Sequence, residues 1–284
     1  MNASNDNVIF LVVIYNKNLA SSNTVKSLVS IKNRKIKCDI VNNGPNKLDE
    51  KEVYFYSEEC EFNIFEYIEN RPLSVIYNDF IERHRNYSRF VILDDDSILT
   101  DSFIDRVFST DRYDLELPKI IDQNNNLSFP ILNYKPIDKN CNVISIADGL
   151  VLSIGSGLII SEKLLSLFDS YGVPLFDRRF SLYGVDTSLF LQLRKMSPKN
   201  ILITSFSFLK HDLSLNDKVV NSFKKKELYL SFALQARLYP SYYNSIRYIK
   251  TSIRFILNGE FFVVYKTFFL FLKGIHPNSK KYIL

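Results

Sequence analysis

The chain has 284 residues and a mass of 33.1 kDa, enough for one large domain or two small ones with a substantial core. Hydrophobic residues make up 46% and charged residues 24%, which excludes a disordered chain, collagen and a coiled coil as overall descriptions. The net charge of +5 is uneven: residues 247–284 carry seven basic residues and one acid, so the rest of the chain sums to −1. A near-neutral body with a basic tail indicates a local anionic partner rather than a nucleic acid.

Targeting and redox signals are few. Cys38, Cys60 and Cys141 form no CxxC pair, so we expect neither a zinc site nor a disulfide framework. The polar N-terminus lacks a basic region before its apolar run, which argues against a signal peptide. No run reaches about 18 apolar residues, so we expect no membrane-spanning helix and a cytoplasmic location.

The first hundred residues alternate between strand and helix patterns. β-Branched and aromatic runs predict strands, and amphipathic segments predict helices. This alternation is typical of an α/β doubly wound sheet. The predicted strands are 8–15, 37–41, 53–56 and 89–93, and the predicted helices are 24–31 and 72–85.

The rest of the chain is more varied. We expect a hairpin within 120–142, a strand–turn–strand unit over 149–161 and a strand over 201–209, with a loop over 211–215. The predicted helices are 101–108, 162–171, one from about Val185, 218–238 and 244–257.

Three consecutive acids, Asp94, Asp95 and Asp96, follow a predicted buried strand. Like charges this close repel, and the carboxyl ends of parallel strands are where ligands bind in open α/β sheets. A Mg²⁺ or Mn²⁺ ion would relieve the repulsion. The alternative is a solvated acidic turn that leads into the next helix.

Two further titratable residues stand at element ends. Asp186 begins an apolar-periodic helix, where it could cap the helix or serve as a general base. His211 follows a predicted strand and could ligate a metal, contact a phosphate or be structural.

Two turns could approach a ligand. Asn42 and Asn43, followed by Gly44, end the second strand and could bind a nucleobase edge or simply form the turn. The glycines around Ser156 permit close backbone approach, so Gly157 is a candidate donor contact. No P-loop, GxSxG, HExxH or GxGxxG motif is present.

Taken in order, these segments resemble a family 2 glycosyltransferase of the GT-A fold. The resemblance covers roughly residues 8–215 and is carried by the ordered set of segments rather than by any one motif. It implies a Rossmann-like central mixed sheet flanked by helices as a catalytic domain, 1–215, followed by a C-terminal helical extension, 216–284. The segments are the opening strand that ends near Tyr15-Asn16, IVNNGP at 40–45, RFVILDDDS at 89–97 and FDRRFSLYGVDTSLFLQLRK at 176–195.

The resemblance also implies a donor site. In this reading Asp94 contacts the ribose or the metal, Asp96 ligates Mn²⁺ or Mg²⁺ beneath the donor diphosphate, and Asp95 holds the variable position of the DxD motif. By family habit the nucleotide is UDP or dTDP. The nucleotide side is completed by Tyr15, Asn42 and Asn43.

The acceptor side follows from the same resemblance. Asp186 matches the base that deprotonates the acceptor hydroxyl, although Val185 stands where the family often has Glu. His211 matches a late His near the metal or diphosphate. A single displacement inverts the anomeric carbon. The processive members carry a Gln-x-x-Arg-Trp motif and membrane-spanning helices, whereas this chain has no Trp, so we expect transfer of one sugar.

The tail predicts a membrane-surface contact. Arg247, Lys250 and Arg254 fall near one face of a helix with isoleucines on another, and the following segment 261–272 is very aromatic. This composition suits an interfacial helix on anionic lipid at the inner face of the cell membrane. It would also fit packing on the core or in a homodimer. The resemblance implies an acceptor linked to lipid, such as undecaprenyl diphosphate, in O-antigen or capsule synthesis.

Two other classes remain open at this point. A nucleotidyltransferase would also use carboxylates and Mg²⁺, but residues 15–23 lack the expected glycine-rich basic phosphate loop. A non-catalytic membrane-associated binding module would have lost its metal acids, and Asp94 and Asp96 are both present.

Overall fold

The computed structural model describes residues 7–122, 124–141, 143–211 and 222–283. They form two compact units. The described parts of the first unit are residues 7–70, 79–122, 124–141, 143–173 and 197–211, and those of the second are residues 71–78, 174–196 and 222–283. Helix α3, Leu73–Arg83, contributes to both units. The functional division predicted at residues 215 and 216 stays a prediction.

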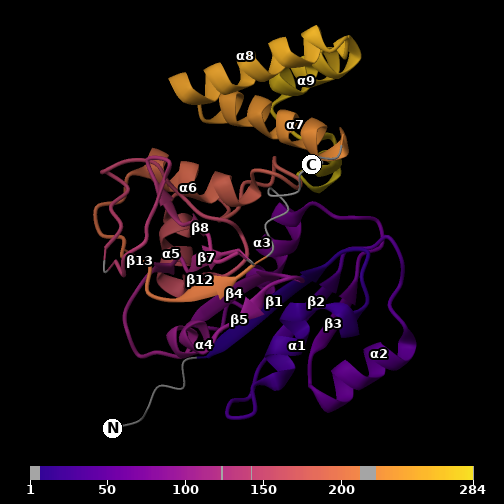
Figure 1. The fold of residues 1–284 in the computed structure, drawn as a ribbon, viewed down its shortest axis with the longest axis vertical. Helices are drawn as coiled ribbons and strands as arrows, with labels where there is room; N and C mark the ends of the chain where they lie inside the picture. The colour runs from indigo at the N-terminus through magenta and orange to yellow at the C-terminus, as the bar shows by residue number, and fades with distance from the viewer. Residues whose placement is uncertain (1–6, 123, 142, 212–221, 284) are drawn as a thin grey trace. The chain divides into compact units, whose positions relative to one another are not determined.

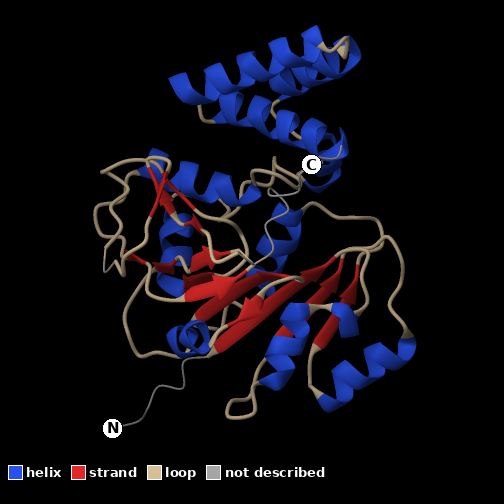
Figure 2. Ribbon diagram, in the orientation of Figure 1, coloured by secondary structure: helices blue, strands red, loops and turns tan. Residues whose placement is uncertain are grey.

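A seven-stranded mixed sheet forms the centre of the first unit (Figure 1 and Figure 2). Its strand order is β13-β6-β12-β4-β1-β2-β3. Strands β4, β1, β2 and β3 run parallel, and β12 is antiparallel to both of its neighbours. The predicted α/β class with a mixed central sheet flanked by helices is therefore confirmed. The strands are β1 Val8–Ile14, β2 Cys38–Asn42, β3 Asn63–Glu66, β4 Arg89–Asp94, β6 Leu115–Glu116, β12 Leu158–Ser161 and β13 Ile203–Thr204.

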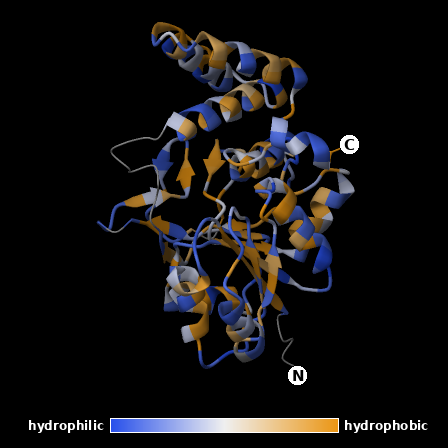
Figure 3. Ribbon diagram, turned by 90° about the vertical axis from the view of Figure 1, so that its right-hand side faces the viewer, coloured by the Kyte–Doolittle hydropathy of each residue, from blue (hydrophilic) through white to orange (hydrophobic). Residues whose placement is uncertain are grey.

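The middle of this sheet is buried on both faces. Every residue of β1 is buried, and so are the first five of β4, which explains their continuous apolar runs. Figure 3 shows the central strands as hydrophobic ribbon. The polar residues that follow these strands therefore lie at the ends of the sheet, outside its apolar middle.

Two small sheets complete the first unit. One has the order β10-β9-β11 and the other β5-β14-β7-β8. The predicted hairpin within 120–142 is present as antiparallel pairs, and the strand–turn–strand unit over 149–161 is β11 followed by β12. The strands are β5 Ile98–Leu99, β7 Lys119–Ile121, β8 Leu127–Phe129, β9 Ile131–Leu132, β10 Lys135–Pro136, β11 Val151–Leu152 and β14 Phe208–Lys210.

The predicted strand at 53–56 is wrong. This segment lies in helix α2, Glu50–Tyr54, and the π-helical turn η2, Phe55–Glu59. Asp49 caps α2 by accepting from the backbone N–H groups of Lys51 and Glu52, and such a cap favours helix over the β-prone side chains that follow. The other helices of the first unit are η1 Leu19–Ser21, α1 Asn23–Ser30, α4 Asp101–Val107 and α5 Glu162–Ser170.

The predicted strand at 201–209 is two strands in two different sheets, β13 and β14. Between them, the backbone N–H groups of Phe206 and Ser207 donate to the carboxylate of Glu116 at 2.7 and 3.0 Å instead of to a neighbouring strand. The Glu116 side chain therefore takes the place of a neighbouring strand at residues 206 and 207, and the single strand that the apolar pattern predicts is interrupted there. Of the predicted loop at 211–215, only His211 lies within the described residues.

The second unit is helical outside its loops. Helices α8 and α9 pack on α7 and on each other. Tyr229 of α7 stacks between Tyr248 and Phe255 of α8, and Tyr248 stacks on Phe271 of α9. Among the described helices none has the length and apolar character needed to cross a bilayer. The elements are α6 Val185–Met196, α7 Ser222–Leu238, α8 Tyr242–Leu257, α9 Phe261–Lys273 and η4 Pro277–Tyr282.

Candidate active site

The register of the central sheet brings the predicted donor residues to one edge. Val13 of β1 pairs with Asp94 of β4, and Ile14 pairs with Asn42 of β2. The strands are parallel, so Tyr15, Asn42 and Asp94 all lie at their carboxyl ends. Ligands of open α/β sheets bind at this edge.

The turn after β2 is held by its own amides. Asn42 is 1% exposed. Its Nδ2 donates to the carbonyl of Asn46 at 2.8 Å, and its Oδ1 accepts from the N–H of Gly44 at 3.1 Å. Asn43, also buried, donates from Nδ2 to Asn70 Oδ1 at 3.1 Å. Both amides therefore shape the turn, while Tyr15, beside it after β1, is 52% exposed.

Asp95 pairs with a basic residue that the sequence analysis does not single out. Lys17 Nζ lies 2.5 Å from Asp95 Oδ1, and the backbone N–H of Tyr15 donates to Asp95 Oδ2 at 3.4 Å. The pair ties the loop after β1 to the acidic turn after β4. It also removes part of the repulsion among the three consecutive acids. A lysine after the first strand is the only sequence signal for this contact.

Asp96 lies beside His211. His211 Nδ1 is 3.1 Å from Asp96 Oδ1, and Oδ1 is buried without a hydrogen bond. Burial raises the pKa of the Asp96 carboxyl; the nearby His211 opposes this rise and Asp95 adds to it. A buried carboxylate oxygen that makes no hydrogen bond is costly unless a positive group compensates its charge; His211 is the neighbour here, and a bound cation could serve in the same place.

Two serines hold this pair in place. Ser97 Oγ is 2.9 Å from His211 Nδ1 and 2.7 Å from Ser156 Oγ, and the Asp94 N–H donates to Ser156 Oγ at 2.9 Å. Ser97 lies in the turn directly after β4, Ser156 precedes β12 and His211 follows β14. Both serines are fully buried, so they position the site rather than reach into solvent. In the sequence Ser156 is flanked by Gly155 and Gly157, a pattern that predicts a turn but not this hydrogen-bonding role.

The Asp96 carboxylate is the kind of oxygen ligand that Mg²⁺ and Mn²⁺ prefer. His211 Nδ1, which forms an ion pair with Asp96 and contacts Ser97 Oγ, would be a second ligand only if it exchanged these contacts for the ion. In the described part of the chain, no group of three or more His, Cys, Asp or Glu side chains is close enough to hold a metal. An ion held here would thus take further oxygens from a substrate phosphate and water, which is how Mg²⁺ commonly binds.

Gly157 has a packing role of its own. Its φ is +91°, and a Cβ there would lie 2.6 Å from Cγ of Pro118. Its N–H donates to the carbonyl of Ile92 at 2.7 Å. Gly157 therefore allows the chain to turn from Ser156 into β12, whether or not a ligand also approaches it.

His211 is held by the short strand that precedes it. Strand β14 pairs with β5 and β7, and the His211 N–H donates to the carbonyl of Ile121 at 3.0 Å. The turn before β14 is fixed by Glu116, a fully buried carboxylate that also accepts from Arg106 Nε at 3.1 Å. Sequence patterns gave no signal for Glu116, because only the fold reveals its burial.

Asp186 belongs to the second unit. It is in the first turn of α6, and its Oδ1 accepts from the Thr187 N–H at 2.7 Å. An acid in this position is stabilised by the helix dipole. Gly184, just before the helix, has a φ of +84°, and a Cβ there would lie 2.4 Å from Ser231 Oγ of α7. The helix start that bears Asp186 is therefore packed against the C-terminal helices of its own unit.

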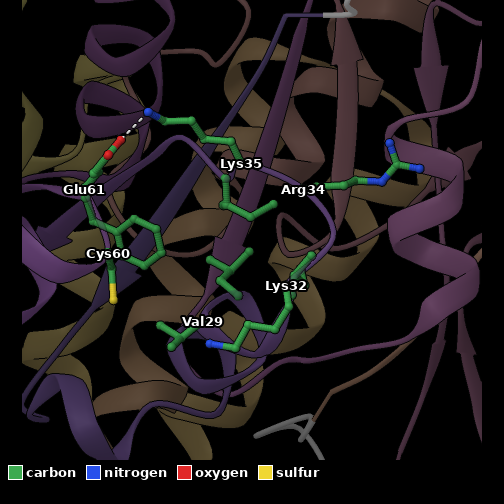
Figure 4. A pocket seen from close by; sticks show the side chains of 10 residues that line it. Val29, Lys32, Arg34, Lys35, Cys60 and Glu61 are labelled. Carbon is green, nitrogen blue, oxygen red and sulfur yellow. Dashed lines mark ion pairs between the residues drawn. The ribbon is translucent and has the colours of Figure 1, made fainter.

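A separate pocket lies at the opposite edge of the sheet. It has a volume of about 290 Å³, and its lining includes Lys32 and Arg34 before β2 and Cys60 and Glu61 before β3 (Figure 4). Both segments precede parallel strands, so the pocket is at their amino ends and is not part of the donor edge.

Comparison with known proteins supports the fold. No protein-family model and no curated protein sequence matches this chain. Solved structures do match. S. aureus TarS is 12% identical with a TM-score of 0.50, over 81% of this chain and 43% of that one. TarS residues 1–349 in complex with UDP is 13% identical with a TM-score of 0.52, over 97% and 91%. GalNAc-T7 with UDP, GalNAc and Mn²⁺ is 13% identical with a TM-score of 0.53, over 82% and 48%.

These likenesses define the fold. The chain has the GT-A fold, which its sequence predicts. It spans less than half the length of the full TarS and GalNAc-T7 chains.

Proposed function

We propose that this chain is a metal-dependent glycosyltransferase that moves one sugar from a nucleoside-diphosphate sugar to an acceptor hydroxyl, with inversion. The observation that carries the proposal is the Asp96–His211 pair, with its buried carboxylate oxygen that makes no hydrogen bond, at the carboxyl edge of a GT-A sheet. Functionally we assign residues 1–215 to catalysis and 216–284 to an extension, although α6 packs with the extension.

The donor diphosphate would lie over the turn after β4. Asp96 and His211 would hold a Mn²⁺ or Mg²⁺ ion, with Asp94 beside it; when bound, the ion supplies positive charge to the departing diphosphate. Lys17 holds Asp95 in place and adds a positive charge at the same edge. Ser97 and Ser156 position His211 and the backbone of Asp94.

The nucleoside would lie at the ends of β1 and β2. Tyr15 is exposed there and offers a ring for stacking, while Asn42 and Asn43 define the shape of the turn and Gly157 borders the serines. UDP or dTDP is the expected nucleotide. The structures of TarS with UDP and with UDP-GlcNAc, and of GalNAc-T7 with UDP and Mn²⁺, support a uridine diphosphate and a divalent metal.

Asp186 is the proposed general base. It would take the proton from the acceptor hydroxyl as the oxygen attacks the anomeric carbon on the face opposite the diphosphate. The proton then resides on Asp186 and the bond to the diphosphate breaks, so one displacement inverts the centre. The acceptor is proposed to be lipid-linked, in synthesis of a surface polysaccharide, with the enzyme peripheral on the cytoplasmic face of the membrane.

The test compares transfer with donor binding. We expect Asp186→Asn to keep the wild-type affinity for UDP with Mn²⁺ and to lose at least about 100-fold in transfer of a radiolabelled sugar to a lipid extract, since a positioned base contributes about 10²–10⁴-fold. Asp105→Asn, which changes an exposed acid on α4, is the matched control. Transfer by Asp186→Asn at the control rate would remove Asp186 from the mechanism.

A further inference from the structure

Helix α8 presents an apolar stripe to solvent. Residues spaced three and four apart fall on one side of a helix. Tyr242, Ile249, Ile253 and Ile256 follow this spacing and are between 42% and 85% exposed. The opposite side carries Phe255 and Asn244, which are buried against the rest of the unit. The stripe therefore has no partner within the described residues.

Helix α9 presents a second and more aromatic stripe. Thr267 and Leu270 are its buried side. Its outer side carries side chains that are 42–66% exposed, which is unusual for so many large apolar groups on one helix. They are Phe261, Phe262, Tyr265, Phe268, Phe269 and Leu272. We call the outer sides of these two helices the α8–α9 surface.

Cations flank both stripes. Lys250 and Arg254 are exposed along one side of the α8 stripe, and Lys266 and Lys273 lie along one side of the α9 stripe. None of these four cations forms an ion pair with an acid of the described residues. Lys266 instead sits over the ring of Phe262, 4.4 Å from its centroid. A groove of about 530 Å³ beside the cations of α8 is lined by tyrosines as well as by Lys250 and Arg254.

We propose that the α8–α9 surface docks on an anionic lipid bilayer. Apolar and aromatic side chains would enter the boundary between headgroups and acyl chains, and the flanking cations would meet lipid phosphates. A second copy of this chain fits the surface less well. Paired copies would bring the same cations together, and only one acid, Glu260, lies between Arg247 and the end of the chain to offset them.

Docking would place the proposed base at the membrane; this consequence rests on the proposed function. The loop before Asp186 is bound to the C-terminal elements of the same unit. Tyr239 Oη donates to Asp177 Oδ2 at 2.6 Å, and Ser279 Oγ donates to the carbonyl of Phe180 at 3.1 Å. A docked unit would therefore carry the start of α6, and with it Asp186, to the membrane on which a lipid-linked acceptor is held.

Vesicle co-sedimentation of the full chain tests this docking. We expect binding to vesicles of phosphatidylcholine with phosphatidylglycerol, weakened by salt, and little binding to phosphatidylcholine alone. Lys250→Gln with Arg254→Gln should weaken binding roughly 25-fold, about fivefold for each charge near the surface. Lys32→Gln with Lys47→Gln removes two exposed charges from the first unit and is the matched control, expected to change binding less than about twofold.

A second variant tests the apolar stripe. Tyr265→Ser with Phe268→Ser should weaken vesicle binding at least about tenfold, because these side chains are 60% and 49% exposed and their loss leaves the buried side of α9 intact. Its circular dichroism and its affinity for UDP should match those of the wild type. Tyr54→Ser, at an exposed tyrosine of the first unit, is the control.

Three results would overturn the proposal. The first is that the wild type binds both kinds of vesicle equally or binds neither. The second is that the control variants weaken vesicle binding as much as the test variants do. The third is that the wild type forms a stable dimer and does not bind vesicles, while Tyr265→Ser with Phe268→Ser is a monomer. The vesicle assay contains no nucleotide or metal, so its failure is distinct from a failure of UDP binding, which would count against the proposed function alone.

Discussion

Replacing Glu116 by Gln should destabilise the first unit strongly. Glu116 is fully buried, and its carboxylate accepts from Arg106, from Thr204 Oγ1, and from the N–H groups of Phe206 and Ser207. A glutamine side chain keeps the volume of Glu116 but replaces one carboxylate oxygen by an NH₂ group, which is a donor and would face the N–H and O–H donors that Glu116 now accepts from. Breaking one partner of a buried charge pair costs about 3–5 kcal/mol. The retained amide oxygen offsets part of this loss, so we expect about 3 kcal/mol.

Thermal and urea unfolding measure this cost. For a unit of this size, about 3 kcal/mol corresponds to a fall of roughly 6–12 °C in Tm. Glu58→Gln, at an exposed glutamate of η2, is the matched control and should stay within about 0.5 kcal/mol of the wild type. Because Glu116 fixes the turn before β14, the variant should also weaken UDP binding through His211. A loss of stability below about 1 kcal/mol would refute the reasoning that this carboxylate organises the turn.

Two other substitutions probe local geometry by the same unfolding measurements. Gly157→Ala should cost about 2–4 kcal/mol, from the left-handed φ and the overlap with Pro118, whereas Gly172→Ala, with a φ of +64° and open space, should cost only about 1 kcal/mol; equal costs would contradict the overlap. Tyr239→Phe should cost about 1.5–3 kcal/mol at neutral pH through its lost bond to Asp177. Burial, reinforced by Asp177, raises the pKa of Tyr239. The contribution of the protonated Tyr239 hydroxyl to the free energy of unfolding is therefore complete below the unfolded-state pKa near 10 and is lost as pH rises above that value. The stability of the wild type should therefore fall more steeply above pH ~10 than that of Tyr239→Phe, and parallel curves would contradict this.

Elements that depend on local patterns were predictable from the sequence. The runs of β1 and β4 are long enough and apolar enough to report burial on both faces, and the turn signals placed Asn42 and Asp94 at strand ends. Because β1, β2 and β4 run parallel, these residues share the carboxyl edge of the sheet. The segment at 53–56 failed because the apolar pattern there is short, and the cap at Asp49 outweighs it.

Contacts between distant segments were not predictable in the same way. Lys17 meets Asp95, and Ser156 meets Ser97, only because β1, β4 and β12 are neighbours in the sheet. Glu116 looked like any charged residue, since nothing in a two-residue strand signals that it is fully buried. The sequence could therefore nominate Asp96 and His211 separately, whereas their 3.1 Å contact is a property of the fold.

The most direct test of the proposed function is a calorimetric titration of the full chain with UDP, with and without Mn²⁺. We expect UDP to bind at least about tenfold more tightly with Mn²⁺ than with excess EDTA, because the ion links the diphosphate to Asp96 and His211. Asp96→Ala should lose this metal dependence, and Asp105→Ala should keep it. Binding that is the same with and without metal, or a metal effect that survives in Asp96→Ala, would contradict the assignment of this edge as the donor site.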